Sequence, residues 1–193
     1  MGACIVRPRT CAPPTADVPT DAEKKNEDVI RELIRQVWNY RWTAADEKRF
    51  GADKSYLPRP VRGAIKKLVS PRVVRHRFDD TDSPRRGDGQ ADLEQCIRDV
   101  HAVCTDLNIE IVQLMSAGDR VMAMLVLTGT DQRADGDGSA EGVLDRTPAS
   151  GRPFRSSVAA TYRLSRGKIV EDWSLSDQPG LSLQLVGPDP ATS

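Results

Sequence analysis

The chain has no net charge, because 28 Lys and Arg residues are matched by 28 Asp and Glu residues among its 193 positions. Proteins that bind nucleic acid or anionic membranes electrostatically carry a basic excess, so neither partner is expected. The sequence also lacks an apolar run of the roughly 18 residues that a membrane-spanning helix needs. Its first residues lack the apolar segment of a secretory signal. Together these gaps favour a cytoplasmic protein.

Metal-binding residues are few and scattered. The four cysteines show no CxxC spacing and the chain has only two histidines, so a structural zinc site is not expected. Cys96 and Cys104 lie on one expected helix, about 12 Å apart along its axis, too far for a disulfide. Reduced thiols fit the expected compartment.

The order of the sequence patterns indicates one domain, residues 20–187, between tails at 1–19 and 188–193. Four prolines mark the first tail as disordered. Thr20 and Glu23 form a capping box before a helical apolar stripe that runs from Val29 to Trp38. Thr43 begins a short helix through Phe50. Residues 51–64 are expected to be largely loop, because they contain two glycines and two prolines.

The second half of the sequence changes from helical to strand periodicity. A strand is expected at 72–78, with Val74, His76 and Phe78 on one face, then a loop at 79–89 and a helix from Leu93 to Cys104. Alternating residues then predict strands near 107–111, 120–132, 154–164 and 168–175, with a long loop at 132–152. The strand at 120–132 is apolar on both faces and is expected to be buried on both. Helices followed by hairpin-connected strands predict an α+β fold, with a curved antiparallel sheet around the helices.

Three ordered motifs carry a resemblance to a known family: "AGDRVMAMLVLTGTD", "SGRPFRSSVAATYRLSRGKIVEDWSLSD" and "LSLQLVG". They resemble the SnoaL-like polyketide cyclases of the nuclear transport factor 2-like superfamily, and weaker matches extend the resemblance over residues 25–187. The resemblance implies a cone-shaped α+β barrel around an apolar cavity, homodimers, and chemistry without a cofactor. It also implies ring closure or a related reaction on a small hydrophobic substrate.

The same resemblance identifies two departures from the aldol cyclases of the family. Ala160 stands where those enzymes have a histidine, and Ser174 stands where they have an aspartate. Their acid/base pair is therefore not present at these positions.

Strand alternation from position 174 predicts which side chains face the cavity. Asp172 is the first candidate for a general acid or base, since burial in an apolar cavity shifts a carboxyl pKa upward. Asp131 is a candidate partner and His76 a candidate proton shuttle. The alternatives are an Asp172 that pairs with an arginine, an Asp131 in water at a strand end, and a structural His76. The candidate substrate-binding residues are Tyr162, Ser174, Trp38, Trp42, Leu125, Leu127 and Ala160.

Other polar and aromatic residues have structural interpretations. Trp38 and Trp42 could equally be core residues, His101 is expected at the surface of its helix, and Asp177 is expected to cap the turn at "DQPG". These expectations leave three hypotheses for function. The first is a cofactor-independent cyclase, dehydratase or isomerase of bacterial secondary metabolism, with the 132–152 loop as a lid. The second is an epoxide hydrolase that uses Asp131 and Asp172. The third is a non-catalytic module that binds a ligand or dimerises.

Overall fold

A computed structural model describes residues 18–78, 85–132 and 150–186. Residues 1–17 of the expected first tail, the whole expected second tail, Cys4, Cys11 and most of the expected lid loop lie outside these residues. No helix in the described ranges is long and apolar enough to cross a membrane. In chain order the elements are α1 (Asp21–Leu33), the π-helical turn η1 (Ile34–Trp38), α2 (Ala44–Ala52), α3 (Arg59–Leu68), β1 (Val69–Phe78), β2 (Arg85–Asp88), α4 (Gly89–Val103), β3 (Asn108–Ala117), β4 (Arg120–Thr130), β5 (Pro153–Ser165), β6 (Lys168–Ser176) and α5 (Gln178–Val186).

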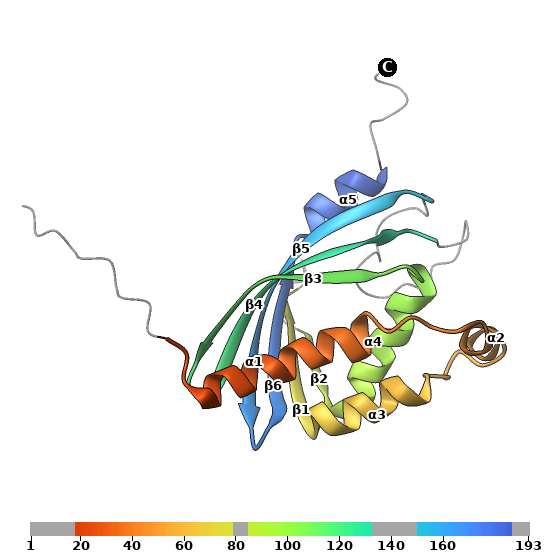
Figure 1. Ribbon diagram of the computed structural model, residues 1–193. Helices are drawn as coiled ribbons and strands as arrows, with labels where there is room; N and C mark the ends of the chain where they lie inside the picture. The colour runs from red at the N-terminus through yellow and green to blue at the C-terminus, as the bar shows by residue number, and fades with distance from the viewer. Residues whose placement is uncertain (1–17, 79–84, 133–149, 187–193) are drawn as a thin grey trace, which may run out of the picture.

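The described strands form one six-stranded sheet in the order β2-β1-β6-β5-β4-β3. All neighbouring strands are antiparallel except β1 and β6, which are parallel. The sheet bends strongly, and α1, α3 and α4 lie on its concave side (Figure 1). This arrangement confirms the expected α+β cone, although β2 and β3 remain open edges and the sheet does not close into a barrel.

The first helix follows its sequence signals. Thr20 accepts a hydrogen bond from the Glu23 N–H, and the Glu23 carboxylate accepts one from the Thr20 N–H, which completes the expected capping box. The helix ends in the wider η1 turn, where the Asn39 N–H donates to the Ile34 carbonyl at 2.8 Å. The Asn39 side chain then pairs with both main-chain groups of Ile109 on the edge strand β3.

Two segments that were expected to be loops are ordered elements. α3 begins at Arg59, because Pro60 sits in the first turn, where a missing N–H costs no hydrogen bond. Its buried side carries Val61, Ala64, Ile65 and Leu68. Residues 85–88 form β2 and pair with β1, so the expected loop at 79–89 is shorter than predicted.

The long strands confirm the alternation pattern, with two corrections to the expected faces. Arg166 and Gly167 both have positive φ, 52° and 71°, as the two-residue turn between β5 and β6 requires. β4 is not buried on both faces along its length: on the convex face Met122 and Met124 are 45% and 39% exposed, and Val126 is buried. On β1 the buried residues are Val69, Val73 and Arg75, rather than the expected set that includes His76.

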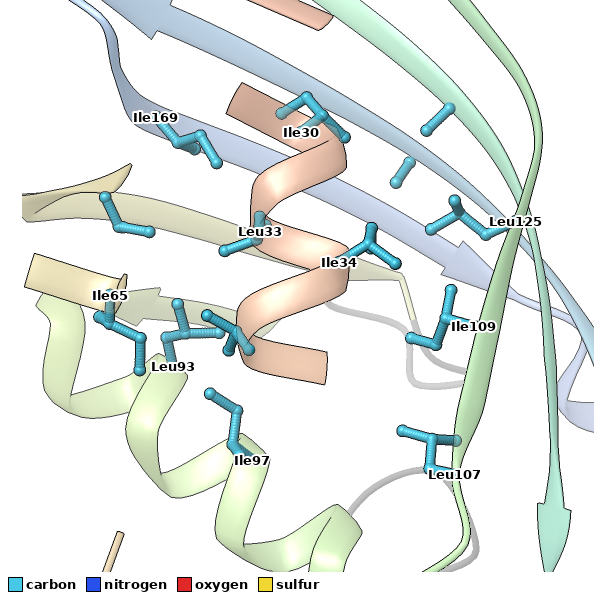
Figure 2. Packing of buried hydrophobic residues seen from close by; sticks show 14 of the residues in the cluster. Ile30, Leu33, Ile34, Ile65, Leu93, Ile97, Leu107, Ile109, Leu125 and Ile169 are labelled. Atoms are coloured by element: carbon cyan, nitrogen blue, oxygen red, sulfur yellow. The ribbon is translucent and has the colours of Figure 1, made fainter. Parts of the chain in front are cut away.

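The hydrophobic core fills the space between the concave face of the sheet and the helices (Figure 2). Ile30 and Leu33 of α1 and Ile34 of η1 project between Ile65 of α3 and Leu125 of β4. Leu93 and Ile97 of α4 close the same core from the other side. The concave face is therefore the side of the sheet on which polar groups would be shielded from water.

Candidate functional site

Asp172 lies on the concave face of β6, as the alternation predicted. The parallel pairing of β1 with β6 places it directly beside Arg75. Its Oδ2 accepts a hydrogen bond from Arg75 Nε at 3.0 Å, and its side chain is only 13% exposed. The alternative that Asp172 pairs with an arginine is thus the observed arrangement, and a charged pair occupies an otherwise apolar face.

Arg75 joins Asp172 to a second carboxylate on the helix above the sheet. Its Nη1 donates a hydrogen bond to Asp92 Oδ2 of α4 at 2.9 Å. Burial by itself lowers the pKa of Arg75, but the neighbouring charges, first Asp172 and also Asp92, raise it above its ordinary value. Arg75 therefore stays protonated. We call Asp92, Arg75 and Asp172 the acid–arginine cluster.

Tyr162 is the cross-strand neighbour of Asp172 on β5 and is buried. Burial raises the pKa of its phenol, and the charge of Asp172 raises it further, while Arg75 opposes the shift. The phenol is therefore neutral under all ordinary conditions. A neutral hydroxyl beside a carboxylate can donate a hydrogen bond to a substrate oxygen.

Ala160 and Ser174 face each other in the next register row of the sheet, with Ala123 beyond them on β4. All three side chains are small, so this part of the concave face presents only small groups between Leu114 on β3 and the acid–arginine cluster. Leu125 belongs to the buried core, and Leu127 and Trp38 pack half-buried against it. The expected substrate-binding residues of the sheet thus share the concave face. Tyr162, Ala160 and Ser174 lie nearest Asp172, whereas Leu125 and Leu127 lie farther along β4.

His76 lies on the opposite, convex face, because adjacent residues of a strand point to opposite sides. Its Nε2 lies 2.9 Å from Glu171 Oε1, and its ring stacks on Trp173 with centroids 5.0 Å apart. Glu171 also accepts a hydrogen bond from Arg163. The expected role of His76 beside Asp172 is therefore not supported by its position.

Asp131 is fully buried at the end of β4, contrary to the alternative that placed it in water. It accepts hydrogen bonds from the Ser150 N–H at 2.9 Å and from Ser150 Oγ at 3.1 Å. Its own N–H donates to the Arg152 carbonyl. These bonds hold together the two ends of the 132–149 segment.

The sheet register also separates Asp131 from Asp172. Asp172 is aligned with Val121 through Tyr162, and Asp131 comes ten residues after Val121, directly past the end of that strand. Ten residues of extended strand span about 33 Å. The two carboxylates therefore do not form the pair that the sequence suggested.

His101 is buried, and its expected place at the surface is wrong. Its ring stacks on Trp42 with centroids 3.5 Å apart, and its Nε2 lies 3.2 Å from Glu47. Phe50 packs edge-on against both rings. Burial lowers the pKa of His101 despite the opposing effect of Glu47. Trp42 therefore belongs to a cluster that attaches α2 to α4.

Sequence reasoning missed Arg75 and Asp92. Arg75 has the same parity as the buried Val73 on its strand, so a correct choice of the inward face would have identified it. Asp92 has no comparable signal, since its contact with β1 depends on how α4 crosses the sheet. For His101 the signal was present: Leu93, Ile97 and His101 recur every four residues.

Asp177 confirms its expected capping role. Its Oδ1 accepts a hydrogen bond from the Gly180 N–H at 3.0 Å, at the start of α5.

Among the residues that the structure describes, no group of three or more His, Cys, Asp or Glu side chains could hold a metal ion.

Comparisons with known proteins bear on the fold and the family. No curated protein matches the chain. A structure from Jannaschia sp. CCS1, assigned as a SnoaL-like polyketide cyclase, is 15% identical with a TM-score of 0.65, over 89% of this chain and 99% of that chain. AclR from Streptomyces galilaeus, assigned as a hydroxylase, is 20% identical with a TM-score of 0.58, over 84% and 96%. IdmH from Streptomyces antibioticus, assigned as a polyketide cyclase, is 22% identical with a TM-score of 0.56, over 83% and 97%.

At these identities the solved structures show a shared fold. The family is shown by the sequence itself, because the model of the SnoaL-like polyketide cyclases matches residues 62–185, which is more than half of the chain. The matched region includes Arg75, Asp92, Tyr162 and Asp172. The chain belongs to the SnoaL-like polyketide cyclase family.

Proposed function

We propose that the chain is an enzyme of the polyketide cyclase type, which cyclises, dehydrates or isomerises a hydrophobic substrate by acid/base chemistry. The observation that carries the proposal is the shielded carboxylate of Asp172, held by Arg75 on the concave face and adjacent to the neutral phenol of Tyr162. Membership of the SnoaL-like family and the cyclase assignments of two structural neighbours support the same reaction class.

The three groups have different roles in this proposal. Asp172 accepts a proton from an activated carbon of the substrate and returns it in a later step. Arg75 acts as a positioning residue, because its Nε hydrogen bond fixes the orientation of the carboxylate. Tyr162 donates a hydrogen bond to the substrate oxygen that gains negative charge.

The test compares two conservative variants on the same strand. Asp172→Asn removes the proton acceptor, whereas Glu171→Gln changes a carboxylate on the opposite face that pairs with His76. The assay follows solvent deuterium exchange into a polycyclic β-diketone by NMR. We expect Asp172→Asn to lower the exchange rate by about a hundredfold or more, and Glu171→Gln to leave it unchanged. Equal rates in Asp172→Asn and the parent chain would instead favour the non-catalytic binding module.

Epoxide hydrolysis is a second candidate, and the acid–arginine cluster is the observation that favours it. Asp131 and Asp172 are too far apart to share one water, so the pair expected from the sequence does not serve this reaction. Asp92 and Asp172 are instead linked through one guanidinium, and Asp92 is 33% exposed. Conversion of a hydrophobic epoxide to its diol, lost in both Asp92→Asn and Asp172→Asn, would support this reaction. Absence of diol with the parent chain would exclude it for that substrate class.

We also propose that the chain forms a homodimer through the convex face of the sheet. Apolar side chains are exposed there in neighbouring positions of β3, β4 and β6, and Arg120 lies over Trp173 beside them. Methionine, tryptophan and arginine are enriched in protein interfaces. The exposed apolar residues on these strands are Val112, Met115, Met122, Met124 and Leu175.

Light scattering after gel filtration tests the dimer. We expect a dimer for the parent chain and a monomer for Met122→Lys/Leu175→Lys. Leu183→Lys is the matched control, because Leu183 is 77% exposed on α5, away from these strands. A parent chain that is monomeric at all concentrations would refute the proposal, as would equal effects of the two variants.

A further inference from the structure

The helix α3 presents a strongly basic surface. Arg59, Arg62, Lys66 and Lys67 are exposed, and the ten residues of the helix include no acid. The opposite side of the helix is buried in the core through Val61, Ala64, Ile65 and Leu68. A concentrated positive surface of this kind contrasts with the zero net charge of the whole chain.

Helix stability does not explain the charges at the start of α3. Negative side chains stabilise the first turn of a helix and positive ones destabilise it, because the N-terminal end carries partial positive charge. α1 follows this rule with Asp21 and Glu23, and α2 follows it with Asp46 and Glu47. α3 begins instead with Arg59 and has Arg62 three residues later. These arginines therefore lower the stability of the helix at its N-terminal end.

Cations from two other elements extend this surface. Lys168 Nζ donates to the Lys66 carbonyl at 2.5 Å, which joins the β5–β6 hairpin to the C-terminal end of α3. Arg166 is exposed in the same hairpin, and Arg72 is exposed on β1 just after the helix. We call this surface the basic face; its residues are Arg59, Arg62, Lys66, Lys67, Arg72, Arg166 and Lys168.

The basic face is not neutralised within the described part of the chain. None of its side chains forms a salt bridge with another described residue. Lys67 interacts weakly with the Glu32 carboxylate, whose main partner is Arg35. The positive charge is thus available to an external group.

We propose that the basic face docks an acidic α-helix of a partner protein, a function separate from the chemistry proposed above. Arg59, Arg62 and Lys66 follow the i, i+3, i+7 spacing and cover about 10 Å along one side of α3. A partner helix with carboxylates at the same spacing places an acid opposite each cation. Arginine adds the planar donor pair that matches a carboxylate.

Two other anionic partners fit the basic face less well. Helices that bind membranes insert large apolar side chains, but the exposed uncharged residues of α3 are only Pro60 and Gly63. Proteins that bind single-stranded nucleic acid stack bases on aromatic side chains, and the basic face has none. The charge pattern and the helical spacing therefore favour a protein partner.

An NMR titration tests the proposal with the full chain and a synthetic helical peptide. The peptide of about 20 residues carries glutamates at i, i+3 and i+7 along one side. A control peptide of the same composition distributes the glutamates around the helix. We expect saturable shifts of amides in residues 59–68 and in the β5–β6 hairpin, with binding weakened by salt. The control peptide should bind at least about fivefold more weakly.

Charge-reversal variants locate the binding site. Arg62→Glu/Lys66→Glu should weaken binding of the ordered peptide by about tenfold or more, whereas Lys25→Glu/Lys48→Glu changes two exposed lysines elsewhere and should change it less than about twofold. If Arg62→Glu/Lys66→Glu does not fold by circular dichroism, Arg62→Gln/Lys66→Gln replaces it.

Three results would overturn the proposal: shifts outside the basic face, equal affinity for both peptides, or equal losses in the two variants. Tighter binding of anionic vesicles or duplex DNA than of the ordered peptide, with the same variant pattern, would assign the face to a membrane or to nucleic acid instead.

Discussion

Arg75 and Asp172 are neighbours on adjacent parallel strands, and the Nε–Oδ2 hydrogen bond of 3.0 Å joins them on the concave face. They are 97 residues apart in the sequence. The pair lies in the only parallel contact among the described strands. Its geometry is therefore a property of the assembled sheet, and its energetics can be measured separately from any activity.

Replacement of Arg75 should destabilise the fold strongly. Arg75→Met leaves two carboxylates near each other without the guanidinium between them, which should lower the free energy of unfolding by about 3–5 kcal/mol. Arg163→Met is the control, because Arg163 pairs with Glu171 at a partly exposed site and should cost at most about 1 kcal/mol. Urea denaturation measures both. The double variant Arg75→Met/Asp172→Leu should recover part of the lost free energy of unfolding. If the effects of the two substitutions on this free energy simply add, the two side chains are not electrostatically coupled.

Stability should depend on pH through His101. Its pKa is lowered in the folded chain, so the unfolded chain binds this proton more readily. Folding stability should therefore fall as the pH drops below the unfolded value of about 6.5, until the lower folded pKa is reached. His101→Phe keeps an aromatic ring against Trp42 and should flatten this part of the curve. Thermal denaturation at several pH values compares the two chains, and parallel curves would contradict the assignment.

Gly129 should tolerate no side chain. A Cβ at this position would lie 2.2 Å from Cys104 Sγ, and Phe154 Cζ would be 3.2 Å away. Gly129→Ala should therefore cost about 1–3 kcal/mol of unfolding free energy. Gly63→Ala is the matched control, since no atom lies within 4 Å of its Cβ, and it should stabilise α3 by up to about 1 kcal/mol. Cys104→Ala should partly rescue Gly129→Ala, and no rescue would show that another contact dominates.

The Cys104 thiol should react slowly in the folded protein. Burial raises its pKa to about 12, and its hydrogen bond to Asp106 adds to the effect. Iodoacetamide labelling followed by peptide mass spectrometry should find Cys104 unmodified in the native chain at mildly alkaline pH, and modified in urea. Rapid native labelling of Cys104 would show that this part of the core opens readily.

Alternation and capping signals sufficed for most of the architecture. The stripe from Val29 to Trp38 predicted α1. The strands expected at 154–164 and 168–175 left a short connection, which is the observed turn at Arg166 and Gly167. The expectation was wrong where the effect of a residue depends on its position within a helix. Pro60 suggested a loop, but a proline in the first helical turn is compatible with α3.

The candidate site was predicted only in part, because its contacts are long-range. Asp172 was placed on the concave face from alternation and family resemblance, and its partner Arg75 depends on the pairing of β1 with β6. Asp131 was assigned to the same face without a measure of distance along β4, and the register separates it from Asp172. Side-chain parity can be read from sequence, whereas the alignment of distant strands cannot.

The pairing of Asn39 with Ile109 has a consequence for aggregation. β3 is an edge of the sheet, and an uncovered edge strand offers its main chain to other molecules. The Asn39 side chain forms hydrogen bonds with both the N–H and the carbonyl of Ile109. Asn39 follows directly after η1, so the end of the first helix positions it there. If that helix detached, the chain would expose its apolar concave face and free part of the β3 edge in the same event. Docking of α1 therefore protects the protein against self-association as well as completing its core.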